Sequence, residues 1–249
     1  MIQDIHSHTY YSFCGQDRPE EIVEAAIAGG IELFGICDHN HGIAFGRRDV
    51  YKLPVEVFPN TYDERALRRY YDHMCLIKEK YADRIRVLCG IEVTADLEKP
   101  KVALPEGVDI SFFDYCLIEN PNLENSLVQK DLFRFADRCA CPHVGVAHTD
   151  MFAFIQSLGE DPYAYFRRMA EQGIFWEMNV SYDSIHKYRE HAYMLEFFRN
   201  EEQQAIVRES GVRLSVGFDG HRVEDYRPDR VADYCRRISA MGIKLAFED

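Results

Sequence analysis

The chain opens with Ile2-Gln3-Asp4-Ile5-His6-Ser7-His8, and near its other end it carries Val216-Gly217-Phe218-Asp219-Gly220-His221. In both segments a short apolar run leads into two polar residues spaced two apart. Five similar apolar runs lie between them, and helical patterns separate all seven. The expected strands are 2–6, 31–37, 85–93, 113–118, 143–147, 174–180 and 213–218. Seven strands that alternate with helices predict an α/β fold in which parallel strands close, or nearly close, into a (β/α)7 barrel.

The segments between the strands carry helix signals. Asp17 and Glu20 around Pro19 are expected to cap the first helix, and Gly29-Gly30 to end it. Further helices are expected over 61–81, 161–173, 184–210 with a break near Asn200, and 229–241. An open doubly wound sheet would show the same alternation and is the alternative fold. No glycine-rich phosphate loop follows the first strand, which argues against a nucleotide-binding version of that sheet.

Composition limits the class of protein. A chain of 249 residues fits one barrel domain over 1–249, and no linker-like stretch interrupts it. The formal charge of -13 argues against long nucleic acid and favours small substrates. The chain shows neither a leader-like start nor an apolar run near the ~20 residues of a membrane span. Its eight cysteines are scattered without a CxxC pair. We therefore expect a cytoplasmic protein with reduced thiols and no membrane partner; the oligomeric state is not indicated.

Polar side chains gather where the expected strands end. In parallel barrels these ends face one mouth, where functional groups collect. The residues concerned are His6, His8, Asp38, His39, Asn40, His41, Glu92, Glu119, Asn120, His148, Thr149, Asp150, Glu177, Asn179, Asp219 and His221. The other four histidines, His73, His143, His186 and His191, are expected to be surface or packing residues.

Each cluster also has an ordinary structural explanation. Asp38-His39 is a plausible turn or helix cap, Glu92 would fit a salt bridge to an arginine, and His148 would fit a core histidine. The pair His6 and His8 places two imidazoles on the same face of a strand, where both reach one cation. Because so many metal-binding side chains follow strand ends together, the set predicts a metal hydrolase barrel.

Taken in order, these motifs resemble the PHP (polymerase and histidinol phosphatase) family of metal-dependent phosphoesterases. The matching motifs are HxH at the first strand (His6, His8), DH after the second (Asp38-His39), Gly90-Ile91-Glu92-Val93 at the third, a single His148 at the fifth, and DxH after the last (Asp219, His221). The resemblance covers essentially the whole chain and implies a distorted seven-stranded barrel. The long segment 61–92 is similar to the histidinol-phosphatase branch.

The resemblance implies a set of metal ligands. His6, His8, Glu92 and Asp219 would bind one ion, Glu92 would bridge to a second bound by His148, and a third would use His39 and His221. The chain departs from the family in two places. After HxH it offers Cys14, Gln16 and Asp17 in place of the usual histidine, and its fourth strand ends at Glu119-Asn120. Glu119 is the candidate oxygen ligand there. We therefore expect two or three divalent ions, with zinc, manganese and iron all compatible with these ligands.

The implied activity is hydrolysis of a small phosphomonoester, such as histidinol phosphate. Divalent ions lower the pKa of bound water from ~16 to near ~7, which provides a metal-bound hydroxide to attack phosphorus. His41 and His221 are the candidate acids for the leaving alkoxide. Arg222 and Arg47, or its neighbour Arg48, are candidates for binding the substrate phosphate, although surface arginines are common.

Three other functions stay open. A phosphodiesterase or exonuclease of the same family would act on short nucleotides. An amidohydrolase would also open with HxH but would have a metal-bridging lysine at a central strand end, and none of the seven ends has one. A degenerate, non-catalytic PHP domain would have lost these ligands, whereas His6, His8, Glu92, His148, Asp219 and His221 are all present.

Overall fold

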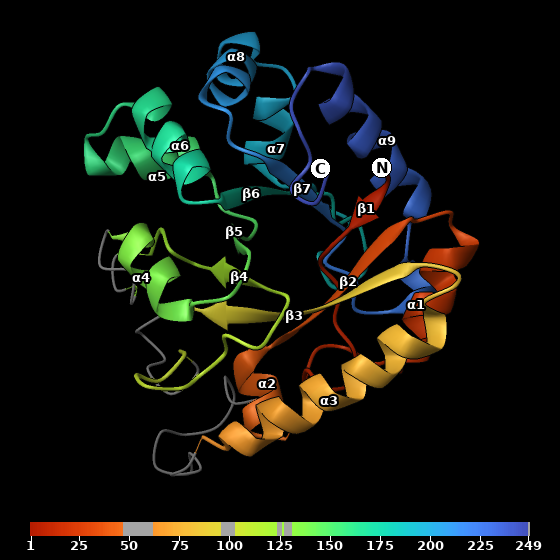
Figure 1. The fold of residues 1–249 in the computed structure, drawn as a ribbon. Coiled ribbons are helices and arrows are strands. Elements are labelled where there is room, and N and C mark those ends of the chain that lie inside the picture. The colour runs from red at the N-terminus through yellow and green to blue at the C-terminus, as the bar shows by residue number, and fades with distance from the viewer. Residues whose placement is uncertain (47–61, 96–102, 124–125, 127–130, 249) are drawn as a thin grey trace.

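A computed structural model describes residues 1–46, 62–95, 103–123, 126 and 131–248. In this part of the chain seven parallel strands form one sheet in the order of the sequence (Figure 1). The strands are β1 (Gln3–Asp4), β2 (Leu33–His39), β3 (Arg86–Thr94), β4 (Tyr115–Glu119), β5 (Val144–Val146), β6 (Ile174–Asn179) and β7 (Leu214–Gly217). All seven expected strands are confirmed, with ends that shift by no more than two residues.

The two edges of this sheet meet and close the barrel. The backbone nitrogen of Ile5 donates to Val216 O at 3.0 Å, and that of Asp219 donates to His6 O at 2.7 Å. A parallel bridge between Ser7 and Gly220 continues this contact beyond β1 and β7. The barrel is therefore confirmed, and the open doubly wound sheet is wrong.

Helices surround the barrel and connect its strands (Figure 1). They are α1 (Pro19–Ala28), α2 (Asn40–Ala44), α3 (Glu64–Tyr81), α4 (Leu132–Cys139), α5 (Met151–Leu158), α6 (Pro162–Glu171), α7 (Ala192–Phe197), α8 (Glu201–Ser210), the 3-10 helix η2 (Val223–Asp225) and α9 (Pro228–Ala240). Within the described residues, none of them has the length and apolar character that a membrane span needs.

Several expected helix ends were wrong. Arg18, not Asp17, precedes the first turn of α1, and its backbone nitrogen donates to Glu21. Helix α3 begins after Asp63, whose carboxylate accepts from Arg65 N; the expected start at residue 61 lies outside the described residues. The expected helix over 184–210 begins only at Ala192, because 184–188 form turns. The expected break is confirmed, since the side chain of Asn200 caps α8.

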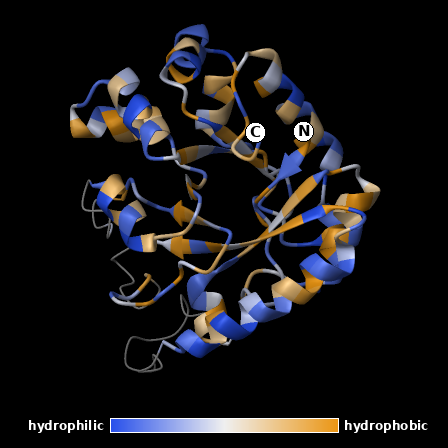
Figure 2. Cartoon of the chain, in the orientation of Figure 1, coloured by the Kyte–Doolittle hydropathy of each residue, from blue (hydrophilic) through white to orange (hydrophobic). Residues whose placement is uncertain are grey.

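Two apolar cores hold the barrel and its helices together. The larger core lies between the strands and the surrounding helices, as the apolar strands and inward helix faces show in Figure 2. The smaller core fills the barrel with residues such as Leu33, Leu88, Tyr115 and Phe175, and the C-terminal Phe247 packs against Tyr115 and Phe175. Most of the buried histidines and carboxylates lie instead at the carboxyl ends of the strands. These ionisable residues therefore form a layer at one end of the barrel.

Candidate metal centre

The structure brings the predicted metal ligands together at the carboxyl ends of the strands. We call this group the strand-end cluster: His6, His8, His39, Glu92, Glu119, His148, Asp219 and His221. They come from six strands, and the closing contact between β1 and β7 brings His6 and His8 next to Asp219. Because parallel strands share one carboxyl end, residues far apart in sequence converge there.

Glu92, near the end of β3, lies at the middle of the cluster. Its Oε1 atom is 3.5 Å from His6 Nε2 and 3.1 Å from His148 Nε2. Its Oε2 atom is 3.5 Å from His8 Nε2 and 2.8 Å from His39 Nδ1. Among the described residues, all ion-pair partners of Glu92 are histidines, so the structure shows no arginine salt bridge there. One carboxylate thus faces two separate sets of imidazoles.

Asp219 forms the second carboxylate of the cluster. Its Oδ1 atom lies 3.0 Å from His8 Nε2, 3.6 Å from His6 Nε2 and 3.8 Å from His221 Nε2. The backbone of Asp219 has a positive φ of 55°, a left-handed conformation that Asp tolerates better than most residues. This conformation, directly after β7, turns the carboxylate into the cluster.

Glu119 points into the cluster from the end of β4. Its Oε1 atom lies 3.7 Å from His39 Nδ1, and the residue is buried. Burial and the nearby carboxylate of Glu92 raise the pKa of Glu119 to about 7. A carboxyl group in this position suits a cation, which would favour its ionised form.

The histidines of the cluster differ in their pKa values. Burial lowers the pKa of His6, but Glu177, Asp219 and Glu92 outweigh this effect and hold it well above its usual value. His8 stacks against both His39 and His221, with ring centroids 4.6 Å apart in each case. Burial and then the His39 ring lower the pKa of His8 to about 3. His8 is therefore neutral at physiological pH, the form in which imidazole binds metals.

Among the described residues, histidines and not lysine or arginine pair with the carboxylates of the cluster. Burial opposes the charged form of Glu92, but the rings of His39 and His6 hold its pKa well below its usual value. Burial likewise opposes protonation of His148, but its hydrogen bond to Glu92 raises its pKa to about 9. Protonated imidazoles thus neutralise the buried carboxylates, a role that divalent cations would take over. Mixed imidazole and carboxylate donors of this kind fit zinc, manganese or iron.

Glu177, on β6, contacts two histidines of the cluster. Its Oε1 atom lies 2.7 Å from His6 Nδ1, and its Oε2 atom accepts from His148 N at 2.8 Å. Gly217 makes this contact possible, because a Cβ there would lie 2.1 Å from Glu177 Oε1. Glu177 was predicted to lie at a strand end, but no function was assigned to it from the sequence. A carboxylate on the far nitrogen of a metal-binding histidine fixes the orientation and tautomer of the ring.

His186 and Asp183 belong to the site, although the sequence reasoning missed them. His186 was expected to be a surface or packing residue, and this was wrong. Its Nδ1 atom lies 2.7 Å from Asp183 Oδ1, and its Nε2 atom lies 3.2 Å from Asp219 Oδ2. Burial opposes protonation of His186, but these two carboxylates raise its pKa to about 10. An Asp and a His three apart in the loop after a strand were the available signal.

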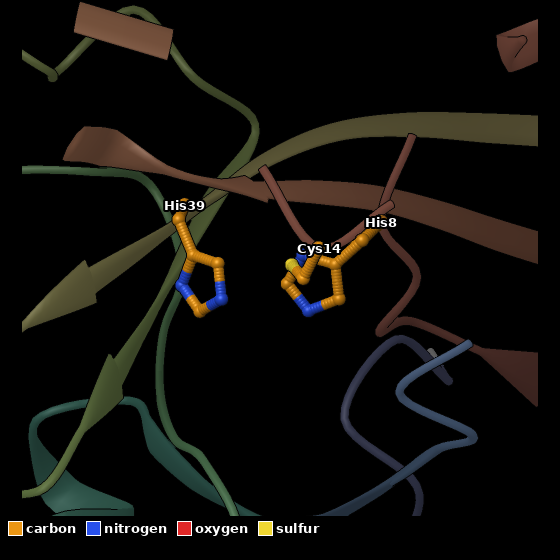
Figure 3. A group of neighbouring side chains, drawn as sticks. All are labelled: His8, Cys14 and His39. Atoms are coloured by element: carbon orange, nitrogen blue, oxygen red, sulfur yellow. The ribbon is translucent and has the colours of Figure 1, made fainter. Parts of the chain in front are cut away.

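A short loop over residues 9–17 covers one side of the cluster. The carboxylate of Asp38 anchors it by accepting from Thr9 N, Thr9 Oγ1 and Ser12 N. The loop places Cys14 beside His8 and His39, as Figure 3 shows. Burial raises the pKa of the Cys14 thiol, but the rings of His39 and His221 outweigh it and lower the pKa to about 7. Asp38 therefore anchors the loop and does not join the cluster.

The other predicted site residues lie beside the cluster or outside it. His41, on α2, is fully buried and stacks against His39 with centroids 4.9 Å apart. Arg222 pairs with Glu224 at 3.5 Å and lines a hollow with Ile22 and Phe34, so the structure does not bring it to the cluster. The predicted Arg47 lies outside the described residues.

Comparisons with known proteins agree with this architecture. A histidinol-phosphatase from Lactococcus lactis subsp. lactis is 25% identical over 114 residues, which are 46% of this chain and 37% of that protein. The chain thus matches little more than a third of that relative's length. A crystal structure of histidinol phosphate phosphatase from Lactococcus lactis, complexed with zinc, L-histidinol and phosphate, superposes with a TM-score of 0.58 at 14% identity. The superposition covers 98% of this chain and 95% of that one.

At that level of identity the structural likeness shows a shared fold. The family itself rests on the sequence profile of the PHP domain, which matches residues 4–222 and so spans the strand-end cluster from His6 to His221. By that match, the chain belongs to the PHP domain family.

Proposed function

We propose that this protein is a metal-dependent phosphatase that hydrolyses a small phosphomonoester. The observation that carries the proposal is the position of Glu92, whose two oxygens face His6 and His148 on one side and His8 and His39 on the other. A carboxylate between two sets of imidazoles suits two neighbouring divalent ions, and paired ions are a common arrangement for phosphate ester hydrolysis.

The proposed ligands follow the cluster. His6, His8, Glu92 and Asp219 would bind one ion, Glu92 and His148 a second, and His39 and His221 would serve a third, with Glu119 beside His39. Bound divalent ions supply charge for the phosphate oxygens and acidify water at neutral pH. Zinc, manganese and iron remain candidates, and the number of ions is two or three.

The chain's own residues orient the site and move protons. Glu177 fixes the His6 ring, and Asp183 fixes the His186 ring so that its Nε2 atom faces Asp219. A proton donor must reach the substrate. The side chain of His186 is 23% exposed, whereas His41 is 0% exposed. We therefore add His186 to the predicted candidates, His41 and His221, for protonating the leaving oxygen.

Histidinol phosphate, or a similar small phosphomonoester, is the proposed substrate. Support comes from the Lactococcus lactis structure, which contains zinc, L-histidinol and phosphate in the same fold. The net charge of -13 disfavours long nucleic acid. An amidohydrolase centre would require a metal-bridging lysine. Among the described residues, no lysine pairs with Glu92 or Asp219. We keep a cytoplasmic location as part of the proposal.

The test combines metal analysis with phosphate release. Purified protein is reconstituted with zinc or manganese, its metal content is measured, and phosphate release is followed on a panel that includes histidinol phosphate. We expect two or three ions per chain and turnover that His8→Ala loses. His73 lies on α3 and pairs with Tyr11 outside the cluster. His73→Ala is therefore the matched control, and it should keep both the bound ions and the turnover.

Two results would contradict the proposal. Bound metal without hydrolysis of any phosphomonoester would redirect the search to phosphodiesters and amides. Failure to bind metal after reconstitution would make a degenerate domain the better explanation.

A further inference from the structure

Cys14 stands among histidines of the strand-end cluster, on the side where the predicted third ion would lie. One donor atom from each of His8, Cys14 and His39 lies within 4.8 Å of the others. The thiol also contacts the ring of His221. Figure 3 shows Cys14 and His8 extending from the segment after β1 and His39 from the end of β2 toward a common space. Donor atoms around a tetrahedral zinc ion lie roughly 3–4 Å apart, so this spacing is close to that of a ligand set.

The loop that carries Cys14 is fixed in place. Three hydrogen bonds to Asp38 anchor residues 9 and 12, and Gln16 N donates to His221 O at 3.2 Å. Gly15 permits the tight return of the chain, because a Cβ there would lie 2.1 Å from Thr9 O. The sulfur therefore reaches the cluster from a braced backbone, as metal ligands generally require.

The other donors in this loop already have different partners. The carboxylate of Asp17 accepts from Val223 N at 2.6 Å. The amide oxygen of Gln16, in the orientation that satisfies both groups, accepts from Arg222 Nη2 at 3.0 Å. Of the three side chains that the sequence offers after HxH, Cys14 is the one directed at the cluster.

A separate observation indicates a cation on this side of the cluster. Glu92 Oε2 and Glu119 Oε1 are buried carboxylate oxygens without a hydrogen-bond partner among the described residues. They lie 2.8 and 3.7 Å from His39 Nδ1, but neither is aligned with it for a hydrogen bond. Buried carboxylate oxygens are costly unless a donor or a cation satisfies them.

We propose that the sulfur of Cys14 is a metal ligand, and that the position it forms beside His39 binds zinc in preference to manganese. A thiolate is a soft donor that suits zinc, whereas manganese favours oxygen. Binding exchanges the thiol proton for the ion, so one proton leaves to solvent. The inference rests on the proposed function, because it concerns the same metal centre, and it adds a sulfur ligand that neither His39 nor His221 supplies.

Cobalt(II) tests this ligand directly. Metal-free protein is titrated with cobalt, and absorption is followed for the near-ultraviolet band of a thiolate bonded to cobalt. The wild type should show the band, Cys14→Ser should lose it together with one bound ion per chain, and Cys14→His should regain the ion without the band. Cys75→Ser, a thiol of similar burial on α3, should behave like the wild type.

A competition titration tests the preference. Zinc affinity at this position should fall by more than about 10-fold in Cys14→Ser, since even outer partners of metal ligands cost that much. In Cys14→His, the ratio of zinc affinity to manganese affinity should be smaller than in the wild type. If this ratio is the same in both proteins, Cys14 does not cause the preference.

Alkylation of the wild type gives a test that needs no variant. Peptide mapping after iodoacetamide should show Cys14 protected in the zinc-loaded protein and labelled in the metal-free protein. Equal labelling of Cys14 in the zinc-loaded and metal-free proteins, or a cobalt band that survives in Cys14→Ser, would overturn the inference. The proposed function would still hold if the protein released phosphate. A protein that binds no metal at all would overturn both.

Discussion

Glu177 shows how one buried side chain determines the geometry of two others. It contacts the far nitrogen of His6 and the backbone of His148, and both belong to the proposed ligand set. Glu177→Gln keeps the size of the side chain but removes its charge. We expect metal affinity to fall by about 10–100-fold, as for other outer partners of metal-binding histidines. A chelator competition measures it; an unchanged affinity, with unaltered stability of the metal-free protein, would show that His6 needs no such orientation.

His186 allows a test that separates proton donation from metal binding. If its half-buried ring protonates the leaving oxygen, His186→Gln should slow hydrolysis of an alkyl phosphate by about 10²–10⁴-fold. An aryl phosphate, whose leaving group needs little protonation, should be affected far less. Rates on histidinol phosphate and p-nitrophenyl phosphate are compared at equal metal content, with His41→Gln alongside. Equal losses on both substrates would assign His186 to supporting Asp219 alone.

The residues predicted from sequence and those missed differ in how their positions are determined. His6, His8, Glu92 and Asp219 follow strand ends, and a parallel barrel brings such ends together whatever the details of packing. Asp183 and His186 lie in turns after β6, where no periodic pattern indicates direction. Their contact with Asp219 depends on the path of that loop in three dimensions. Arg222 was predicted from its place beside His221, but its side chain contacts Glu224 and Gln16 instead of the cluster.

At the scale of elements, strands were predicted better than helix ends. Each strand is a short apolar run between the two cores, and burial leaves little choice of residue there. Helix ends depend on single hydrogen bonds. Asp17 resembled a cap for α1, yet its carboxylate accepts from Val223 N. This contact joins the segments after β1 and β7 where the barrel closes, and no local sequence pattern reveals it.

His143, just before β5, links the stability of this part of the barrel to pH. It packs edge-on against Phe247, and burial and then Arg86 lower its pKa below the usual 6.5. The unfolded chain therefore takes up this proton first on acidification, so the free energy of unfolding should fall as pH drops below about 6.5. Denaturant titrations of metal-free protein between pH 8 and 5 should show a smaller loss in His143→Gln. Parallel curves for the two proteins would mean that His143 titrates alike in both states.

For the whole molecule, the closure of the barrel makes the site a property of the folded chain. His8 and Asp219 come from opposite ends of the sequence, yet their side-chain atoms lie 3.0 Å apart. The contact exists only because β1 meets β7, through Ile5 N and Val216 O among others. In the unfolded chain these ligands are dispersed. Metal binding should therefore stabilise the closed barrel over the unfolded state.

Thermal unfolding measures this coupling. Zinc at 100 times its dissociation constant adds about 2.7 kcal/mol, which for a chain of this size raises the Tm by roughly 5–10 °C. His8→Ala should show a smaller rise, and His73→Ala the full one. The eight free thiols give the unfolded chain some affinity for zinc, which reduces the effect, so manganese, which binds thiols poorly, serves as a second probe. If neither ion raises the Tm of the wild type, the strand-end cluster is stable through its own ion pairs and the barrel does not depend on metal.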